Sequence, residues 1–221
     1  MPGRDRAAFI RANTAIASPS LVPELLLHLA TAVTPLWHAT EASLAQSQLP
    51  PPYWAFAWPG GQALARYLLD HPDRARGKRV LDFGAGCGIA GIAALKAGAA
   101  QASAFEIDPF AACAIALNGA LNGAAPSVFL TDVLASGVGH FSAADIILVG
   151  DMCYERPLAD RLAAWLNDAV AAGVTVLIGD PGRAYLPKQG LEFVISYAVP
   201  TSLDLEDRIN RDTAVYRLRK P

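Results

Sequence analysis

A short apolar run followed by closely spaced glycines is the part of this chain best suited to chemistry. Val80 to Phe83 read as a strand, and Gly84, Gly86 and Gly88 follow directly. Because glycine has no Cβ, the backbone can approach a ligand closely there, and the helix that follows presents free N–H groups to it. Glu106 ends the next apolar run, where a carboxylate can accept hydrogen bonds from ribose hydroxyls. The pattern indicates a nucleotide-type cofactor.

Two cofactors are compatible with this glycine loop. Gly86 to Gly91 has the G-x-G-x-x-G spacing of dinucleotide-binding turns, a six-residue match that is weak by itself. Asp82 precedes Gly84 closely, and a carboxylate there repels a pyrophosphate but attracts a sulfonium or ammonium cation. S-adenosylmethionine carries both cations and no phosphate, so the loop favours it over NAD. A structural glycine turn without a ligand is the remaining alternative.

An acidic residue lies at the end of every predicted parallel strand. Ligands of open α/β sheets bind beyond the carboxyl ends of the strands, so these residues are the first candidates for a site. They are Asp82, Glu106, Asp132, Asp151 and Asp180. Carboxylates gathered in one cleft repel one another, which favours a role in ligand binding over one in stability. Capping of the following helix is the alternative, and it is strongest for Asp132.

Asp151 and Tyr154 follow the fourth predicted strand, where the methyl group of the cofactor would be delivered. An acid and a phenol beside a methyl donor suit an amine nucleophile. A carboxylate can hold the amine, a desolvated pocket can lower the pKa of a lysine, and the tyrosine ring can contact its cation. The alternative is that Asp151 caps the helix near Pro157 and that Tyr154 belongs to the core.

Alternating strands and helices must position these residues. Apolar periodicity predicts strands at 79–83, 102–107, 127–131, 144–150 and 174–179, with helices at 88–97, 109–122 and 156–171 between them. Two more strands, at 191–199 and 213–219, have no helix-sized spacer and predict an antiparallel hairpin. The fold class is therefore α/β: a Rossmann-like, seven-stranded, mostly parallel sheet with a C-terminal hairpin and helices on both faces.

The chain before this sheet is predicted to be an N-terminal helical extension, residues 1–48, ahead of a catalytic domain at 49–221. Leu21 to Ala45 have apolar residues near a helical period. The prolines at 50–52 break that helix, so Tyr53 to Pro59 form a constrained aromatic arm, and Gly60 to Asp70 form the next helix.

Composition excludes several function classes. The chain has 221 residues, of which 53% are hydrophobic, and a net charge of −2, so no general attraction to nucleic acid or to an anionic membrane is expected. Three cysteines without paired spacing predict neither a disulfide framework nor a metal site. No apolar run approaches the roughly 20 residues of a membrane span.

Four segments of the chain resemble the electron transfer flavoprotein β-subunit lysine methyltransferases, which are seven-β-strand, class I protein methyltransferases dependent on S-adenosylmethionine. The segments are Pro52 to Gln62, Val80 to Gly88, Gly150 to Tyr154 and Ile178 to Arg183. The similarity extends from about residue 50 to about residue 199. The aromatic arm and the Gly-Asp-Pro-Gly-Arg turn are much more specific than the glycine loop.

The resemblance implies a role for each candidate residue. The cofactor would be held by residues of the arm, the glycine loop and two strand ends: Trp58, Gly84, Gly86, Gly88, Glu106 and Asp132. Asp82 joins these cofactor-binding candidates because of its charge beside the loop. Glu106 would bind the ribose and Asp132 would approach the adenine amine. Asp151 and Tyr154 match the acid-x-x-Tyr motif that lines the lysine channel of this family, and they are the candidate catalytic residues.

The resemblance also implies a partner, the electron transfer flavoprotein β subunit, for a chain expected to be a monomer. The expected compartment is the cytoplasm for a bacterial protein and the mitochondrion for a eukaryotic one. Three alternatives stay open: a small-molecule amine N-methyltransferase, an NAD(P)-dependent oxidoreductase, and a cofactor-binding regulator. The oxidoreductase would need a nicotinamide-side catalytic pair, such as a Tyr-x-x-x-Lys motif, beside the cofactor loop.

Overall fold

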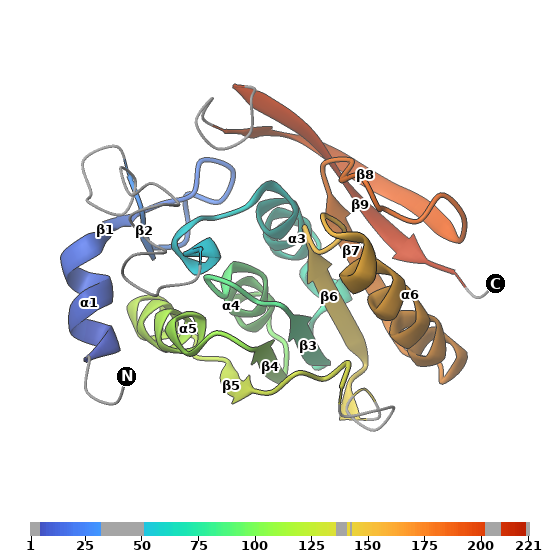
Figure 1. Cartoon of the computed structure of the whole chain (residues 1–221), viewed down its shortest axis with the longest axis horizontal. Helices are drawn as coiled ribbons and strands as arrows, with labels where there is room; N and C mark the ends of the chain where they lie inside the picture. Colours follow the sequence, from blue (N-terminus) through green and yellow to red (C-terminus); the bar gives the residue numbers. More distant parts are fainter. Residues whose placement is uncertain (1–4, 32–50, 136–140, 142, 202–208, 220–221) are drawn as a thin grey trace.

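The fold is built around one seven-stranded sheet. The computed structural model describes residues 5–31, 51–135, 141, 143–201 and 209–219. Its strands are β3 (Arg79–Phe83), β4 (Gln101–Glu106), β5 (Ser127–Leu130), β6 (Ile146–Gly150), β7 (Thr175–Asp180), β8 (Leu191–Pro200) and β9 (Asn210–Leu218). They lie in the order β5-β4-β3-β6-β7-β9-β8 (Figure 1). The predicted fold class is confirmed.

The five strands β3 to β7 are parallel, and the hairpin of β8 and β9 forms one lateral side of the sheet. β3 pairs with β4 and with β6, and β6 pairs with β7, all in parallel register. β9 inserts antiparallel between β7 and β8. Because the parallel strands share one direction, the carboxyl ends of β3, β4, β6 and β7 meet at one edge of the sheet. The candidate site residues lie at that edge.

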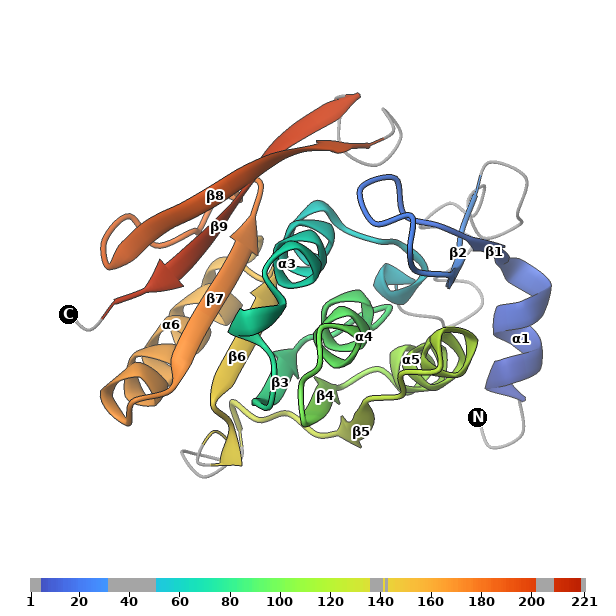
Figure 2. The ribbon, with the colours of Figure 1, turned by 180° about the vertical axis from the view of Figure 1, so that it is seen from behind.

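Helices cover both faces of the sheet, as Figures 1 and 2 show. On one face lie α3 (Pro59–Asp70), α4 (Ile89–Lys96) and α5 (Pro109–Asn122), and on the other lies α6 (Arg156–Ala171). Buried apolar residues fill both layers. Leu64 and Leu148 belong to the α3 side, and Trp165 and Val149 belong to the α6 side. Within the described ranges, no helix is long and apolar enough to cross a membrane.

The N-terminal part differs from its prediction. α1 (Arg6–Asn13) is followed by two short antiparallel strands, β1 (Ala15–Ala17) and β2 (Leu27–Leu29). The expected helix from Leu21 is therefore wrong over 21–31, and the rest of that range lies outside the described residues. Tertiary contacts override the helical period: the Asn118 side chain of α5 accepts a hydrogen bond from the His28 backbone N–H at 2.7 Å. Pro23 also interrupts any helix there.

Candidate active site

The glycine loop after β3 has a backbone that only glycine adopts readily. Gly84, Gly86 and Gly88 have φ of +58°, +57° and +80°. A Cβ on Gly84 would lie 2.7 Å from the Met152 Sδ, and one on Gly88 would lie 3.1 Å from the Ile115 side chain. A Cβ on Gly86 would meet no atom closer than 4.0 Å. The loop is packed at its two ends and open at Gly86, which leaves room for a ligand against its backbone.

Glu106 lies beside this open point. The parallel register pairs Phe83 of β3 with Phe105 of β4, so both strands end at the same level. One Glu106 carboxylate oxygen accepts a hydrogen bond from the Gly86 N–H at 2.6 Å, and the other accepts from the Ile107 N–H at 3.1 Å. Burial raises the pKa of Glu106 above its ordinary value. The fold thus brings the glycine loop and Glu106 together, as the sequence predicted.

Asp82 lies underneath the glycine loop. Its side chain is buried, and its Oδ2 accepts a hydrogen bond from the Gly91 N–H in the first turn of α4 at 2.8 Å. Burial raises the pKa of Asp82 to about 7, and the nearby Glu106 charge adds to the shift. The Asp82 carboxylate therefore lies below the loop, and only its electric field could reach a cation above the loop.

We expect Asp82 to make stability depend on pH. Because its pKa in the folded protein, about 7, lies above the ordinary value of 3.8, the folded state binds more protons than the unfolded state between these values. The free energy of unfolding should therefore fall as pH rises through 7. Asp82→Asn can still accept from the Gly91 N–H and should lose this part of the pH dependence. Denaturant unfolding at pH 5 and pH 8 measures it, and parallel pH profiles for the two proteins would contradict it.

Asp132 and Asp180 cap turns at the same edge. Asp132 Oδ1 accepts from the N–H groups of Leu134 and Ala135, and its Oδ2 lies 3.4 Å from Arg161. Asp132 therefore caps a turn, and no helix follows it in the described residues up to 135. Asp180 Oδ1 accepts from the N–H groups of Gly182 and Arg183 at 2.7 and 2.6 Å. Both side chains hold backbone turns in place.

Asp151 is turned into the protein. It is the one non-glycine residue with positive φ, +59°, in the described part of the chain. Its Oδ2 accepts from the Gly60 and Gly61 N–H groups at 2.6 and 3.3 Å, and its Oδ1 accepts from the Arg183 Nη2 at 2.8 Å. Only 8% of the residue is exposed.

These contacts correct two expectations. The Asp151 carboxylate does not face outward beside Tyr154. It also does not cap α6, which begins after Glu155 without a side-chain cap. Asp151 caps the start of α3 instead. The carboxylate has a raised pKa, about 6, because burial outweighs the Arg183 charge.

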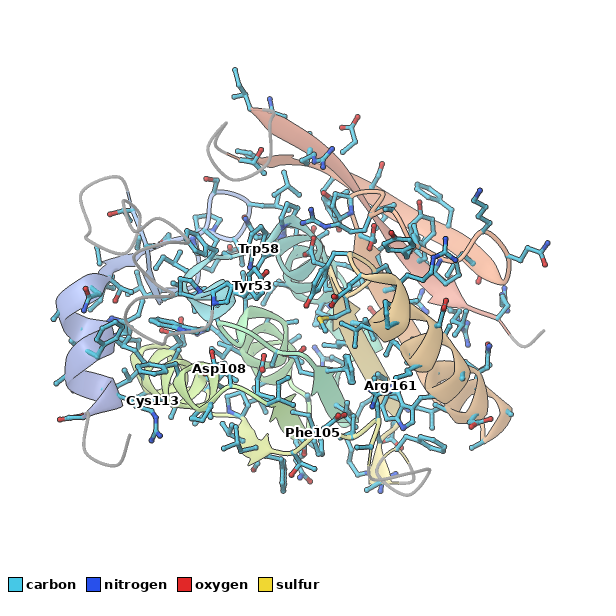
Figure 3. All side chains as sticks on the ribbon, in the orientation of Figure 1. Tyr53, Trp58, Phe105, Asp108, Cys113 and Arg161 are labelled. Atoms are coloured by element: carbon cyan, nitrogen blue, oxygen red, sulfur yellow. The ribbon has the colours of Figure 1, made fainter. Side chains whose placement is uncertain are left out.

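Aromatic side chains gather next to Asp151, as expected for the arm. Tyr53 and Tyr154 have ring centroids 6.1 Å apart, and Tyr53 and Trp58 have theirs 6.0 Å apart. The Trp58 Nε1 donates to the Tyr53 carbonyl oxygen at 2.9 Å. Figure 3 shows Tyr53 and Trp58 beside the start of α3. Tyr154 is 45% exposed and Tyr53 is 52% exposed, so neither is a core residue. We call Tyr53, Trp58 and Tyr154 the aromatic cluster.

The close packing of α3 on the sheet was not foreseen. A Cβ on Gly60 would lie 2.1 Å from the Gly179 carbonyl oxygen, and one on Gly179 would lie 2.2 Å from the Gly60 carbonyl oxygen. These two glycines let the α3 N-terminus reach the ends of β6 and β7, where Asp151 binds it. The Pro59-Gly60-Gly61 run at a helix start was the only sequence signal for this approach.

Arg183 and Ile107 were also missed as candidates. The Arg183 guanidinium lies between Asp151 and the Trp58 ring. Ile107 follows Glu106, directly after β4, and is 72% exposed. Among the described residues, no group of acids, histidines or cysteines could hold a metal ion.

Comparisons with known proteins find methyltransferases. Residues 62–152 match the family model of ribosomal protein L11 methyltransferase (PrmA). The electron transfer flavoprotein β subunit lysine methyltransferase of Rattus norvegicus is 48% identical over 80% of this chain and 68% of its own length. That of Mus musculus is 41% identical over 95% of this chain and 82% of its own length.

Solved structures of low identity share the fold. The ribosomal protein L11 methylase of Lactobacillus delbrueckii subsp. bulgaricus has a TM-score of 0.51 and 22% identity, covering 72% of this chain and 77% of that one. The magnesium protoporphyrin IX methyltransferase of Synechocystis PCC 6803, solved with S-adenosylmethionine, has a TM-score of 0.51 and 15% identity, covering 84% and 88%.

Proposed function

Because the chain belongs to the electron transfer flavoprotein β-subunit lysine methyltransferase family, we propose that it methylates a lysine side chain of the electron transfer flavoprotein β subunit. The methyl donor is S-adenosylmethionine. The observation that carries the proposal is the aromatic cluster, which lies next to the loop that follows β6, where Met152 packs against the glycine loop. A methyl-donor site and a site for an amine therefore adjoin.

The residues of this edge fit the cofactor. Glu106 lies at the open point of the glycine loop and has two carboxylate oxygens that can accept from ribose hydroxyls. The open space at Gly86 would let the methionine portion approach the backbone, and Asp132, two residues after the end of β5, would approach the adenine amine. The half-buried Trp58 ring would lie against the cofactor, and the buried Asp82 carboxylate would favour a cation above it. When bound, S-adenosylmethionine supplies an electrophilic methyl group.

The chain's own residues prepare the amine. The exposed rings of Tyr53 and Tyr154 can hold a lysine side chain by cation–π contact. Desolvation of the lysine between these rings would lower its pKa, so that its Nζ would lose a proton to solvent and present a lone pair. This lone pair would take the methyl group that bound S-adenosylmethionine supplies, and the cofactor would be left as a neutral thioether. Asp151 fixes the start of α3 and the loop carrying Tyr154, and thereby sets the distance between amine and methyl group.

We expect Glu106→Ala to weaken S-adenosylmethionine binding by on the order of 1.5–3 kcal/mol, because a charge-assisted hydrogen bond to the ribose is lost. Isothermal calorimetry measures the change. Glu192→Ala is the control, since Glu192 lies on β8, away from the glycine loop, where it pairs with Arg219. Equal affinities for Glu106→Ala and the wild type would assign Glu106 a structural role.

Methyl transfer from labelled S-adenosylmethionine to purified electron transfer flavoprotein tests the proposal. The expected product is methyllysine in the β subunit, located by mass spectrometry, and a lysine-to-arginine variant at that position should abolish labelling. No labelling of the flavoprotein, with labelling of a metabolite amine from a cell extract, would favour the small-molecule N-methyltransferase. The proposed enzyme is a monomer that acts in the compartment of its flavoprotein: the cytoplasm in bacteria, the mitochondrion in eukaryotes.

A further inference from the structure

The turn after β7 carries Arg183, which contacts both Asp151 and Trp58. β7 ends at Asp180, and Gly182 has φ of +88°. Asp180 Oδ1 accepts from the N–H groups of Gly182 and Arg183, so the backbone that carries the arginine is held against the end of β7. The side chain of Arg183 starts from a fixed point at the carboxyl edge of the sheet.

The guanidinium then makes two different contacts. Its Nη2 and Nε donate to the Asp151 Oδ1 at 2.8 and 3.2 Å. Its Cζ lies 5.7 Å from the centroid of the Trp58 ring, within the range of a cation–π contact. The Arg183 side chain is 18% exposed and that of Asp151 is 9% exposed. Poor solvation makes both contacts stronger than they would be at the surface.

These contacts form a closed set that links Asp151, Arg183 and Trp58. The second oxygen of Asp151 binds the Gly60 N–H, and Gly60 stands two residues after Trp58, at the start of α3. Trp58 is therefore tied to Asp151 through the backbone of α3 and, independently, through the guanidinium of Arg183. The aromatic cluster depends on this closed set of contacts, because Trp58 contacts Tyr53 and Tyr53 contacts Tyr154.

We propose that Arg183 is a positioning residue for methyl transfer, which sets the Trp58 ring relative to Asp151 and so fixes the aromatic cluster around the lysine. This inference rests on the proposed function but concerns a residue outside the acid-x-x-Tyr motif and the cofactor loop. A planar guanidinium can bond to a carboxylate and lie over an indole ring at the same time, whereas an ammonium is a compact point charge. The role requires arginine and not merely a cation.

The competing explanation is that Arg183 only neutralises a buried carboxylate. Arg183→Lys separates the two, because lysine retains a cation for Asp151 but not the flat group over Trp58. Arg183→Met removes both contacts. Arg66 is a matched control: its side chain is 17% exposed and is ion-paired with Glu24 and Asp70, the latter at the far end of α3.

The experiment measures kcat and the environment of Trp58 in the full chain. With 5-fluorotryptophan incorporated, the ¹⁹F resonance of Trp58 is assigned by its absence in Trp58→Phe. We expect Arg183→Met and Arg183→Lys to shift this resonance and to lower kcat by about 100-fold, as for a misplaced reacting pair. Arg66→Met should leave both unchanged. The lysine variant keeps the buried carboxylate paired, so it serves if the methionine variant does not fold.

Three outcomes would overturn the proposal. Arg183→Lys with near wild-type kcat would make Arg183 a neutralising charge, and an unmoved Trp58 resonance would show that the arginine does not position the ring. A loss in Arg66→Met as large as in Arg183→Met would reflect general destabilisation of α3. Failure of the proposed function has a different signature, since the wild-type protein would then transfer no methyl group to the flavoprotein while the ¹⁹F comparison still reports on Arg183.

Discussion

Asp151→Asn is expected to lower the rate of methyl transfer by about 10²–10³-fold while S-adenosylmethionine still binds, because positioning and not cofactor contact is lost. In the wild-type protein one carboxylate accepts from the Arg183 guanidinium on one oxygen and from the Gly60 N–H on the other. An asparagine has one acceptor oxygen and one NH₂ group. The NH₂ group of the asparagine must therefore face either the Gly60 N–H or the Arg183 guanidinium, both of which are donors. Either α3 or Arg183 then loses its hydrogen-bond acceptor.

Single-turnover rates and calorimetric affinities measured on the same preparation test this expectation. Asp145→Asn is the control, because Asp145 precedes the opposite end of β6 and is likewise paired with an arginine, Arg79, at 2.9 Å. That pair is about half exposed, and surface pairs contribute little. A near wild-type rate for Asp151→Asn would show that Asp151 has no role in methyl transfer.

Gly179→Ala is expected to destabilise the fold by about 3 kcal/mol, at the upper end of the cost of overpacking. The added Cβ would lie 2.2 Å from the Gly60 carbonyl oxygen and 2.8 Å from the Leu64 side chain. The backbone of α3 cannot yield without leaving Asp151. The helix must therefore move away from β7, and activity should fall together with stability.

Chemical denaturation measures this effect. Gly61→Ala is the matched control, because a Cβ there meets only an Ile89 methyl group, at 3.1 Å, and alanine favours a helix. Equal unfolding free energies for Gly179→Ala and Gly61→Ala would show that the close approach of α3 to β7 contributes nothing.

Local patterns determined most of the sheet. The apolar runs at β3, β6 and β7 are bounded by glycines and acids, so their lengths and order could be predicted to within a residue or two. The Asp108 cap and the left-handed Gly123 bound α5 in the same local way. The segment around Leu27 could not be predicted, because its strand exists only through contacts with β1 and α5.

The sequence by itself also determined which residues gather at the site. Parallel strands bring their carboxyl ends together, so Glu106 had to lie near the glycine loop and Asp151 had to lie at the same end of the sheet. Only the tertiary structure decided where each side chain points. Asp151 turns inward because the α3 N-terminus, carried by residues ninety positions earlier, and the Arg183 guanidinium both offer hydrogen-bond donors to it. The pattern at a strand end specifies where an acidic residue lies along the chain. Which groups donate hydrogen bonds to its buried carboxylate depends on the distant donors that packing brings within reach.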